Sequence, residues 1–333
     1  MWRTQAGTSG TARRVLLGFL AVTLLTVGCT PTAGSSATAG GPLITVAVIP
    51  GADNAPVMIG IKEGLFRDHG LNVAVKTYSS LQREFQALKN GSVDVAAGDY
   101  ADFFYEAAVG KASVHLVAAG YDATPNVMEV LSLPSSGIRT PQGLVHKVVA
   151  TPEPQLIPSG TGVPYSIETL AAQSVLNSGG VTPTDVTWKP TPAQNMISEL
   201  RSGKVGAILA TEPYITEAES ELGAVEVMDA CSGQTAGLPI SGYFSLAAYA
   251  SAHRAQLQQF QAALGSAQAS AAGGSLQTML PRFTGMSTQN AALVTIGSFP
   301  TSLSVGQVQR VADLMYVTGV ISTPLSVSKL ASG

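Results

Sequence analysis

Apolar and polar positions follow the same order twice along this chain. In residues 84–102, EFQALKNGSVDVAAGDYAD, apolar side chains recur at helical spacing, a glycine follows, and a short apolar run comes next. Residues 195–214, NMISELRSGKVGAILATEPY, repeat this order, with Gly203 in the place of Gly91. The spacing predicts an amphipathic helix, the glycine its C-terminal end, and the apolar run a doubly covered strand. Two copies about one domain apart predict two similar α/β lobes.

The segments around each copy predict further strands and helices in alternation, which is typical of a parallel sheet. The expected strands are 43–49, 71–75, 115–118, 128–133, 147–151, 185–189, 225–228 and 242–250. The expected helices are 56–70, 103–109, 164–176, 254–264, 276–279, 289–293 and 304–317.

Two turn-rich stretches, 134–143 and 231–238, are the expected crossings between the lobes. They predict a first lobe made of 43–133 plus 240–333 and a second lobe made of 134–239. The last part of the chain therefore packs back on the first lobe, which makes that lobe discontinuous.

The N-terminus predicts a secretory signal peptide over residues 1–28. Arginines precede an apolar run that is too short to span a membrane. The run ends in LLTVGC, which resembles the bacterial lipoprotein box, although Thr26 stands where leucine is usual. We expect Cys29 to be lipidated and residues 29–42 to form a flexible tether. An ordinary cleaved signal with a stray cysteine is the alternative, and Arg13-Arg14 leaves twin-arginine export open.

Composition excludes several classes of function. The net charge is −3 and charged residues make up 12% of the 333 residues, so nothing marks a nucleic-acid surface. The four histidines are scattered, and neither a metal-ligand pattern nor a nucleophile motif is present, so we expect no metal, cofactor or catalysis. Cys231 has no partner for a disulfide in the mature chain, and we expect a monomer.

Several stretches together resemble a known family. They are NAPVMIGIKEGLFRDHGLNVAV, SSLQREFQALKNGSVDVAAGDYADF, SGTGVPYSIETL, LRSGKVGAILATEPY and QRVADLMYVTGVI. The chain from about residue 43 resembles the substrate-binding lipoproteins of nitrate, taurine, aliphatic-sulfonate and thiamine-pyrimidine importers (SsuA/THI5-like). The resemblance implies an α/β, two-lobed type II periplasmic-binding-protein fold with two crossover segments. It also implies an ABC permease with its ATPase as partners, and a lipid-anchored position on the outer face of the bacterial cytoplasmic membrane.

Ligands of such sheets bind at the carboxyl ends of strands, where loops lead into helices. That rule selects polar and aromatic loop residues from both lobes as ligand contacts. They are Asp53, Asn54, Ser79, Ser80, Asp99, Tyr100, Ser159, Thr161, Tyr165, Thr211, Glu212 and Tyr214. The structural alternatives are helix capping for the serines, turn chemistry for Asp53 and Asn54, and core packing for Tyr100 and Tyr165.

The candidate loops contain no Arg or Lys, while Asp99 and Glu212 follow equivalent strands and should face each other across a cleft. Carboxylates with tyrosine rings favour a flat, nitrogen-bearing ligand such as a thiamine-pyrimidine precursor. An aliphatic sulfonate, taurine or nitrate held by backbone N–H groups is the alternative, in which both acids only brace their loops. A lipoprotein that senses a ligand without transport is a further alternative.

Overall fold

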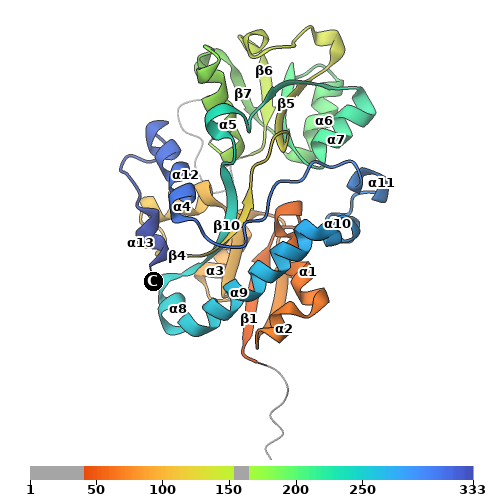
Figure 1. Cartoon of the computed structure of the whole chain (residues 1–333). Helices are drawn as coiled ribbons and strands as arrows, with labels where there is room; N and C mark the ends of the chain where they lie inside the picture. Colours follow the sequence, from red (N-terminus) through yellow and green to blue (C-terminus); the bar gives the residue numbers. More distant parts are fainter. Residues whose placement is uncertain (1–40, 154–164, 333) are drawn as a thin grey trace, which may run out of the picture. The chain divides into compact units, whose positions relative to one another are not determined.

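Two five-stranded sheets organise the chain, in a computed structural model that describes residues 41–153 and 165–332 (Figure 1). The predicted signal peptide, Cys29, most of the tether, Ser159 and Thr161 lie outside the described residues. Among the described residues, no helix combines the length and the apolar character that crossing a membrane requires.

The first sheet has the strand order β2-β1-β3-β10-β4. β1 (Leu43–Val48) lies parallel to β2 (Asn72–Thr77) on one side and to β3 (Val95–Asp99) on the other. β10 (Pro239–Leu246) runs antiparallel between β3 and β4 (Val114–Asp122). A strand from the last third of the chain therefore lies between β3 and β4 and joins β4 to the sheet.

The second sheet repeats this plan with the order β7-β6-β8-β5-β9. β6 (Val148–Thr151) is parallel to β7 (Thr187–Pro190) and β8 (Ala207–Thr211). β5 (Met128–Ser132) is antiparallel between β8 and β9 (Val225–Asp229). Strand by strand, the two sheets have the same relative order and direction, which confirms the predicted repeat and the α/β class.

β5 corrects one expectation. The predicted limits assign residues 128–133 to the first lobe, yet β5 pairs with β8 and β9 in the second sheet. The chain therefore passes between the sheets at Ala123–Val127, before the turn-rich stretch 134–143, which forms short 3-10 turns after β5. The return passage, Ala230–Leu238, lies between β9 and β10.

Thirteen helices accompany the strands in the described part of the chain. Around the first sheet they are α1 (Ala55–Glu63), α2 (Leu65–Asp68), α3 (Leu81–Lys89), α4 (Tyr100–Ala108), α8 (Ala247–Ala252), α9 (Arg254–Ser270), α10 (Leu276–Thr284), α11 (Thr288–Ala291), α12 (Val305–Val317) and α13 (Val327–Ala331). With the second sheet lie α5 (Ile167–Ser178), α6 (Ala193–Arg201) and α7 (Tyr214–Leu222).

Local chemistry explains where three elements differ from the predictions. The single helix expected over 56–70 is broken into α1 and α2 at Gly64, whose φ of +82° is left-handed and unfavourable for residues with a Cβ. α5 begins at Ile167 rather than Pro164, because Ser166 and Thr169 form a capping box. The strand expected over 242–250 ends at Leu246, and the alanine-rich residues after it form α8.

Helices of the C-terminal part cover the first sheet. α9 packs on α1 and α2, and α12 packs on α4. α9 also closes the open edge of the sheet, because the side-chain amides of Gln261 and Gln268 donate hydrogen bonds to the β4 carbonyls of Val117 and Ala119. Free edges are otherwise templates for pairing with other chains.

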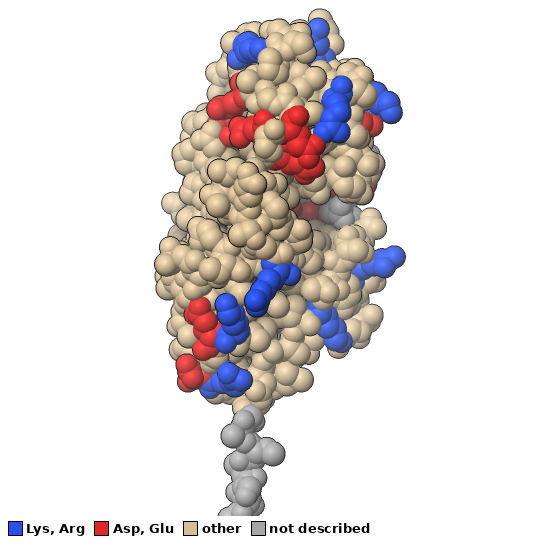
Figure 2. All heavy atoms as spheres, turned by 90° about the vertical axis from the view of Figure 1, so that its right-hand side faces the viewer, with Lys and Arg blue, Asp and Glu red and all other residues tan. Residues whose placement is uncertain are grey.

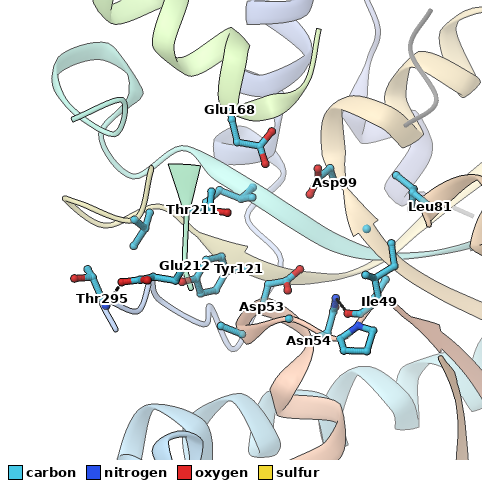
Figure 3. A pocket seen from close by; sticks show the side chains of 17 residues that line it. Ile49, Asp53, Asn54, Leu81, Asp99, Tyr121, Glu168, Thr211, Glu212 and Thr295 are labelled. Carbon is cyan, nitrogen blue, oxygen red and sulfur yellow. Dashed lines mark hydrogen bonds between the residues drawn. The ribbon is translucent and has the colours of Figure 1, made fainter. Parts of the chain in front are cut away.

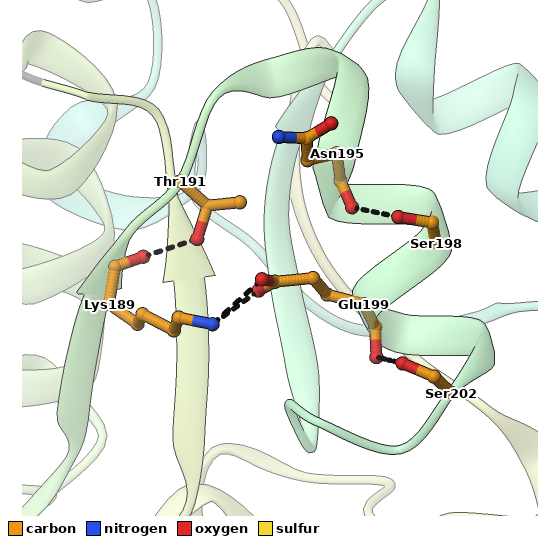
Figure 4. A network of polar contacts seen from close by, with 6 residues as sticks. All are labelled: Lys189, Thr191, Asn195, Ser198, Glu199 and Ser202. Atoms are coloured by element: carbon orange, nitrogen blue, oxygen red, sulfur yellow. Dashed lines mark hydrogen bonds and ion pairs between the residues drawn. The ribbon is translucent and has the colours of Figure 1, made fainter.

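An ion pair fastens the edge of the second sheet to a helix (Figure 4). Nζ of Lys189 in β7 lies 2.8 Å and 2.7 Å from the two carboxylate oxygens of Glu199 in α6. Its neighbour Thr191 donates from Oγ1 to the Lys189 carbonyl at 3.0 Å. Since the lysine is partly exposed, we expect the pair to contribute about 1 kcal/mol or less to the free energy of unfolding.

Candidate functional site

A cavity of about 260 Å³ lies where loops from the two sheets meet (Figure 3). The parallel strands of both sheets turn their carboxyl ends toward it, as open α/β sheets do at ligand sites. Its lining residues come from the turn after β1, the ends of β3, β4 and β8, the start of β10, the first turns of α3 and α5, the first passage between the sheets and the segment before α12. They are Ile49, Pro50, Gly51, Ala52, Asp53, Asn54, Leu81, Ala97, Gly98, Asp99, Tyr121, Val127, Glu168, Thr211, Glu212, Ile240 and Thr295.

The charges in this lining are all negative. Figure 3 shows the carboxylates of Asp53, Asp99 and Glu168 turned toward the same space. No Lys, Arg or His is among the described lining residues, and the described chain forms no ion pair with any of these three acids. The sequence of 154–164 contains no charged residue that could compensate them.

The pKa values of these acids reflect burial first and the neighbouring carboxylates second. Burial raises the pKa of Asp53 to about 6, against a hydrogen bond from the Ser241 side chain that favours the ionised form. Burial, and then the nearby Glu168 carboxylate, raises the pKa of Asp99 well above its usual range. A positive charge placed between these acids would relieve both effects.

A further carboxyl lies behind the wall of the cavity. Glu84 of α3 is fully buried and accepts a hydrogen bond from the Ala97 backbone N–H at 2.9 Å through Oε1. Burial raises its pKa well above the usual range, and the Asp53 charge adds to that effect. Glu84 therefore holds β3 in place beside the cavity through this hydrogen bond.

Glu212 differs from the other acids, because both of its carboxylate oxygens accept hydrogen bonds from the protein. Its Oε2 accepts from the backbone N–H of Thr216 at 3.1 Å, and its Oε1 accepts from the Thr216 hydroxyl at 2.9 Å. Oε1 also accepts from the backbone N–H of Thr295 at 3.0 Å. The carboxylate thus fixes the first turn of α7 and a distant part of the chain, which is the bracing role stated above as the alternative to ligand contact.

That distant part is residues 293–299, which we call the strap. Its Gly297 N–H donates to the hydroxyl of Tyr121, and its Ser298 pairs with Asp122 through two backbone hydrogen bonds of 2.9 Å and 3.0 Å. Thr124 donates from Oγ1 to the Ile296 carbonyl at 3.2 Å. The strap therefore joins the end of β4 and the first passage to Glu212 at the end of β8.

Other predicted contacts fall in two groups. Asn54 and Thr211 line the cavity, and Asn54 also donates to the Ile49 carbonyl at 3.0 Å, which braces the turn. Ser79 and Ser80 line an adjoining cavity of about 210 Å³ that shares Asp99 and Glu168 with the first. Ser80 additionally caps α3 by accepting from the backbone N–H of residue 83.

The predicted tyrosines are not part of either lining. Tyr100 is fully buried beside Phe104 and Phe244, so it belongs to the core of the first lobe. Tyr165 and Tyr214 pack partly buried against hydrophobic clusters. The predicted contact of these three tyrosines with the ligand is therefore not supported by the cavity lining. Among the described residues, the tyrosine that lines the 260 Å³ cavity is Tyr121.

Sequence reasoning missed Glu168, Tyr121 and Thr295. Glu168 could have been found, because a serine two residues before it is a helix-capping signal and places it in the first turn of a helix at the cleft. Tyr121 and Thr295 carry no such local signal, since their position depends on the contact between β4 and the strap.

Among the described residues, no group of three or more His, Cys, Asp or Glu side chains is arranged to hold a metal ion.

Comparison with known proteins identifies the family and the fold. The model of the NMT1-like family matches residues 38–273. No curated protein sequence matches the chain.

Solved structures share the fold at low sequence identity. The periplasmic aliphatic sulphonate binding protein SsuA from Escherichia coli superposes with a TM-score of 0.72 at 16% identity, over 88% of this chain and 98% of that one. The periplasmic nitrate-binding protein NrtA from Synechocystis PCC 6803 gives 0.64 at 11% identity, over 86% and 84%. The desulfurization enzyme DSZB gives 0.65 at 13% identity, over 87% and 96%. The chain thus has the periplasmic-binding-protein fold, as predicted.

Proposed function

The chain belongs to the NMT1-like family, and we propose that it is the extracytoplasmic solute-binding lipoprotein of an ABC importer for a small amine-bearing ligand. The ligand occupies the cavity between the two sheets, and a nitrogen heterocycle such as a thiamine-pyrimidine precursor has the required chemistry. Its partners are an ABC permease with its ATPase. Binding proteins among the solved structures of this fold support the transport role.

The observation that carries the choice of ligand is the set of Asp53, Asp99 and Glu168, which line the cavity with no cation beside them in the described chain. One unit charge about 4 Å from another interacts by about 4 kcal/mol at an effective dielectric constant of about 20. That energy favours an ammonium or a protonated ring nitrogen, and it opposes a sulfonate or nitrate by a similar amount.

Because the predicted tyrosines do not line the cavity, the expected way in which the protein recognises its ligand changes. Stacking on Tyr100, Tyr165 or Tyr214 does not support the proposal, because these rings pack in hydrophobic clusters. N–H donors on the ligand that reach Asp99 and Glu168 support it instead, since charge-assisted hydrogen bonds are the stronger kind. The proposal therefore rests on charge and hydrogen bonding more than on a flat shape.

An anion remains the second candidate, because solved structures of the same fold are named as aliphatic sulphonate and nitrate binding proteins. Backbone N–H groups at helix N-termini could hold such a ligand without any Lys or Arg. The fold alone does not exclude catalysis either, because a desulfurization enzyme shares it. We expect no catalysis, so incubation with pyridoxal phosphate should give no Schiff-base absorbance.

A thermal-shift panel of matched charges tests the proposal. The panel contains diamines, aminopyrimidines, thiamine precursors and amino acids, set against taurine, alkyl sulfonates and nitrate. At a hundredfold excess over Kd, a bound ligand adds about 2.7 kcal/mol to the free energy of unfolding, or about 5 °C in Tm. We expect such a shift with an amine-bearing compound.

Charge-removing variants make the same panel decisive. At the same ligand concentration, the shift should fall by about half or more in Asp99→Asn, whereas Asp68→Asn, which removes an exposed charge on α2, should keep it. A shift with a sulfonate that persists in Asp99→Asn would assign the anion candidate instead. If no ligand is found and no permease or ATPase gene adjoins this one, a sensing lipoprotein without transport is favoured.

A further inference from the structure

A second group of carboxylates lies where the chain enters the second sheet, outside the lining of the cavity. Glu129, the second residue of β5, is buried with 4% of its surface exposed. Its Oε1 accepts a hydrogen bond from Nδ2 of Asn126 at 2.8 Å, and its Oε2 has no hydrogen-bond partner in the described structure. Asn126 belongs to the first passage, Ala123–Val127, and has a left-handed φ of +68°.

The elements packed around Glu129 bring further acids. Asp229 of β9 is its direct cross-strand partner, and Glu226 of β9 lies 3.4 Å from the same Asn126 amide through Oε2. Glu219 faces the group from α7, which packs on β5. The partner on β8 is the uncharged Ala210.

No cation offsets these charges directly. None of the ion pairs of the described chain involves Glu129, Glu219, Glu226 or Asp229. Figure 2 shows acidic side chains gathered on the face that carries α6 and α7, with basic side chains at its margin. Like charges on opposed strand positions destabilise a sheet, so ionisation of the buried member has a cost.

The buried Glu129 carboxyl has a pKa near neutral pH in this environment. Burial raises the pKa of Glu129 from 4.5 to about 7, the Asn126 hydrogen bond opposes this, and Glu226, Glu219 and Asp229 add to it. The group therefore changes charge in the range in which an exposed glutamate is already ionised.

We propose that Glu129 makes the first passage between the sheets respond to pH. With a neutral carboxyl, Asn126 and the start of β5 keep the arrangement described above. With an ionised carboxyl, repulsion by the acids of β9 and α7 loosens residues 123–132. A passage that loosens in this way gives the two halves of the molecule more freedom at higher pH, whatever ligand the cavity accepts.

The direction of the pH dependence of stability follows from the raised pKa of Glu129. The stabilising contribution of the neutral form is complete below about pH 4.5 and is lost as the pH rises through about 7. Asp122, at the other end of the passage, titrates in the same direction, because burial raises its pKa to about 6 against the effect of Arg310. Both Asp122 and Glu129 therefore contribute to the pH dependence of local stability in the native protein, and a variant is needed to separate the contribution of Glu129.

Hydrogen–deuterium exchange of the ligand-free protein tests the proposal. Peptides covering 123–132 are compared at about pH 5 and about pH 7.5, after correction for intrinsic exchange, and local opening should increase about tenfold or more at the higher pH. In Glu129→Gln, which keeps an acceptor for Asn126 without a charge, most of this increase should disappear. Asp68→Asn, with an exposed acid removed on α2, should retain it.

Two results would overturn the proposal. One is an equal pH dependence of opening in the native protein and Glu129→Gln. The other is an equal dependence in the native protein and Glu226→Gln, the variant to use if Glu129→Gln does not fold. Removing the Glu226 charge should lower the pKa of Glu129 and reduce the increase in opening between the two pH values, because one source of repulsion is gone.

Discussion

Acids of the same cavity have different tasks, and their hydrogen bonds distinguish them. Both oxygens of Glu212 accept hydrogen bonds from Thr216 or Thr295, whereas Asp99 makes no capping hydrogen bond to the helix that begins directly after it. Asp99 and Glu168 thus retain more acceptor capacity toward the space they line. The sequence predicted that Asp99 and Glu212 follow equivalent strands, and both line the cavity, but the hydrogen bond from Thr295 to Glu212 depends on the strap, about eighty residues away in the chain.

Substitution of these acids should change the affinity for the ligand. Asp99→Asn and Glu168→Gln should each weaken binding of an amine-bearing ligand by about 1.5 to 3 kcal/mol, which is typical of hydrogen bonds to charged groups. Isothermal titration calorimetry measures the change, with Asp68→Asn on α2, which removes an exposed charge, as the control for charge removal. Tight binding of an alkyl sulfonate that either variant leaves unchanged or improves would contradict the prediction.

The strap connects elements that are far apart in sequence. It is held to the end of β4 by Tyr121 and Asp122, and to the start of α7 by the single acceptor Glu212. No periodicity marks residues 293–299, because the segment has neither a helical nor an alternating apolar pattern. By contrast, the helix–glycine–strand units were predictable, since their apolar spacing and terminal glycines are local signals.

Removing the Glu212 charge should therefore lower stability more than affinity. Glu212→Gln keeps one acceptor oxygen and loses the other, so we expect the free energy of unfolding to fall by about 1 to 2 kcal/mol. Chemical denaturation measures this loss, and Asp68→Asn, which removes an exposed charge on α2, is again the control. A large loss of ligand affinity with unchanged stability would show instead that Glu212 contacts the ligand.

The strand β5 shows why the limits of the lobes were harder to predict than the lobes themselves. Its apolar run carries no information about which sheet it joins, because pairing is decided by β8 and β9, both of which follow later in the chain. The same holds for the tyrosines. Tyr100 follows a strand end, as a ligand contact would, yet phenylalanines from α4 and β10 enclose it.

For the molecule as a whole, the family match and the two-sheet fold agree with the resemblance drawn from the sequence. Attachment to the membrane is a prediction that depends on Cys29, which lies outside the described residues. Cys29→Ala should release the protein from the membrane fraction, because stable anchoring requires the attached acyl chains. Cys231→Ala is the control, since that thiol is buried. Unchanged fractionation of Cys29→Ala would exclude lipid anchoring.

The place of β10 in the first sheet has a consequence for the newly made chain. β3 and β4 are not neighbours, since both pair with β10, which emerges more than a hundred residues after them. A nascent chain that ends before residue 239 therefore lacks the strand that joins β4 to the rest of the sheet, and the glutamines that bind the β4 carbonyls are also still to come. Such a chain cannot complete its first lobe early. The first sheet can form completely only after the last third of the polypeptide has been made. Until then its strand edges stay unpaired, and shorter chains can associate through these edges.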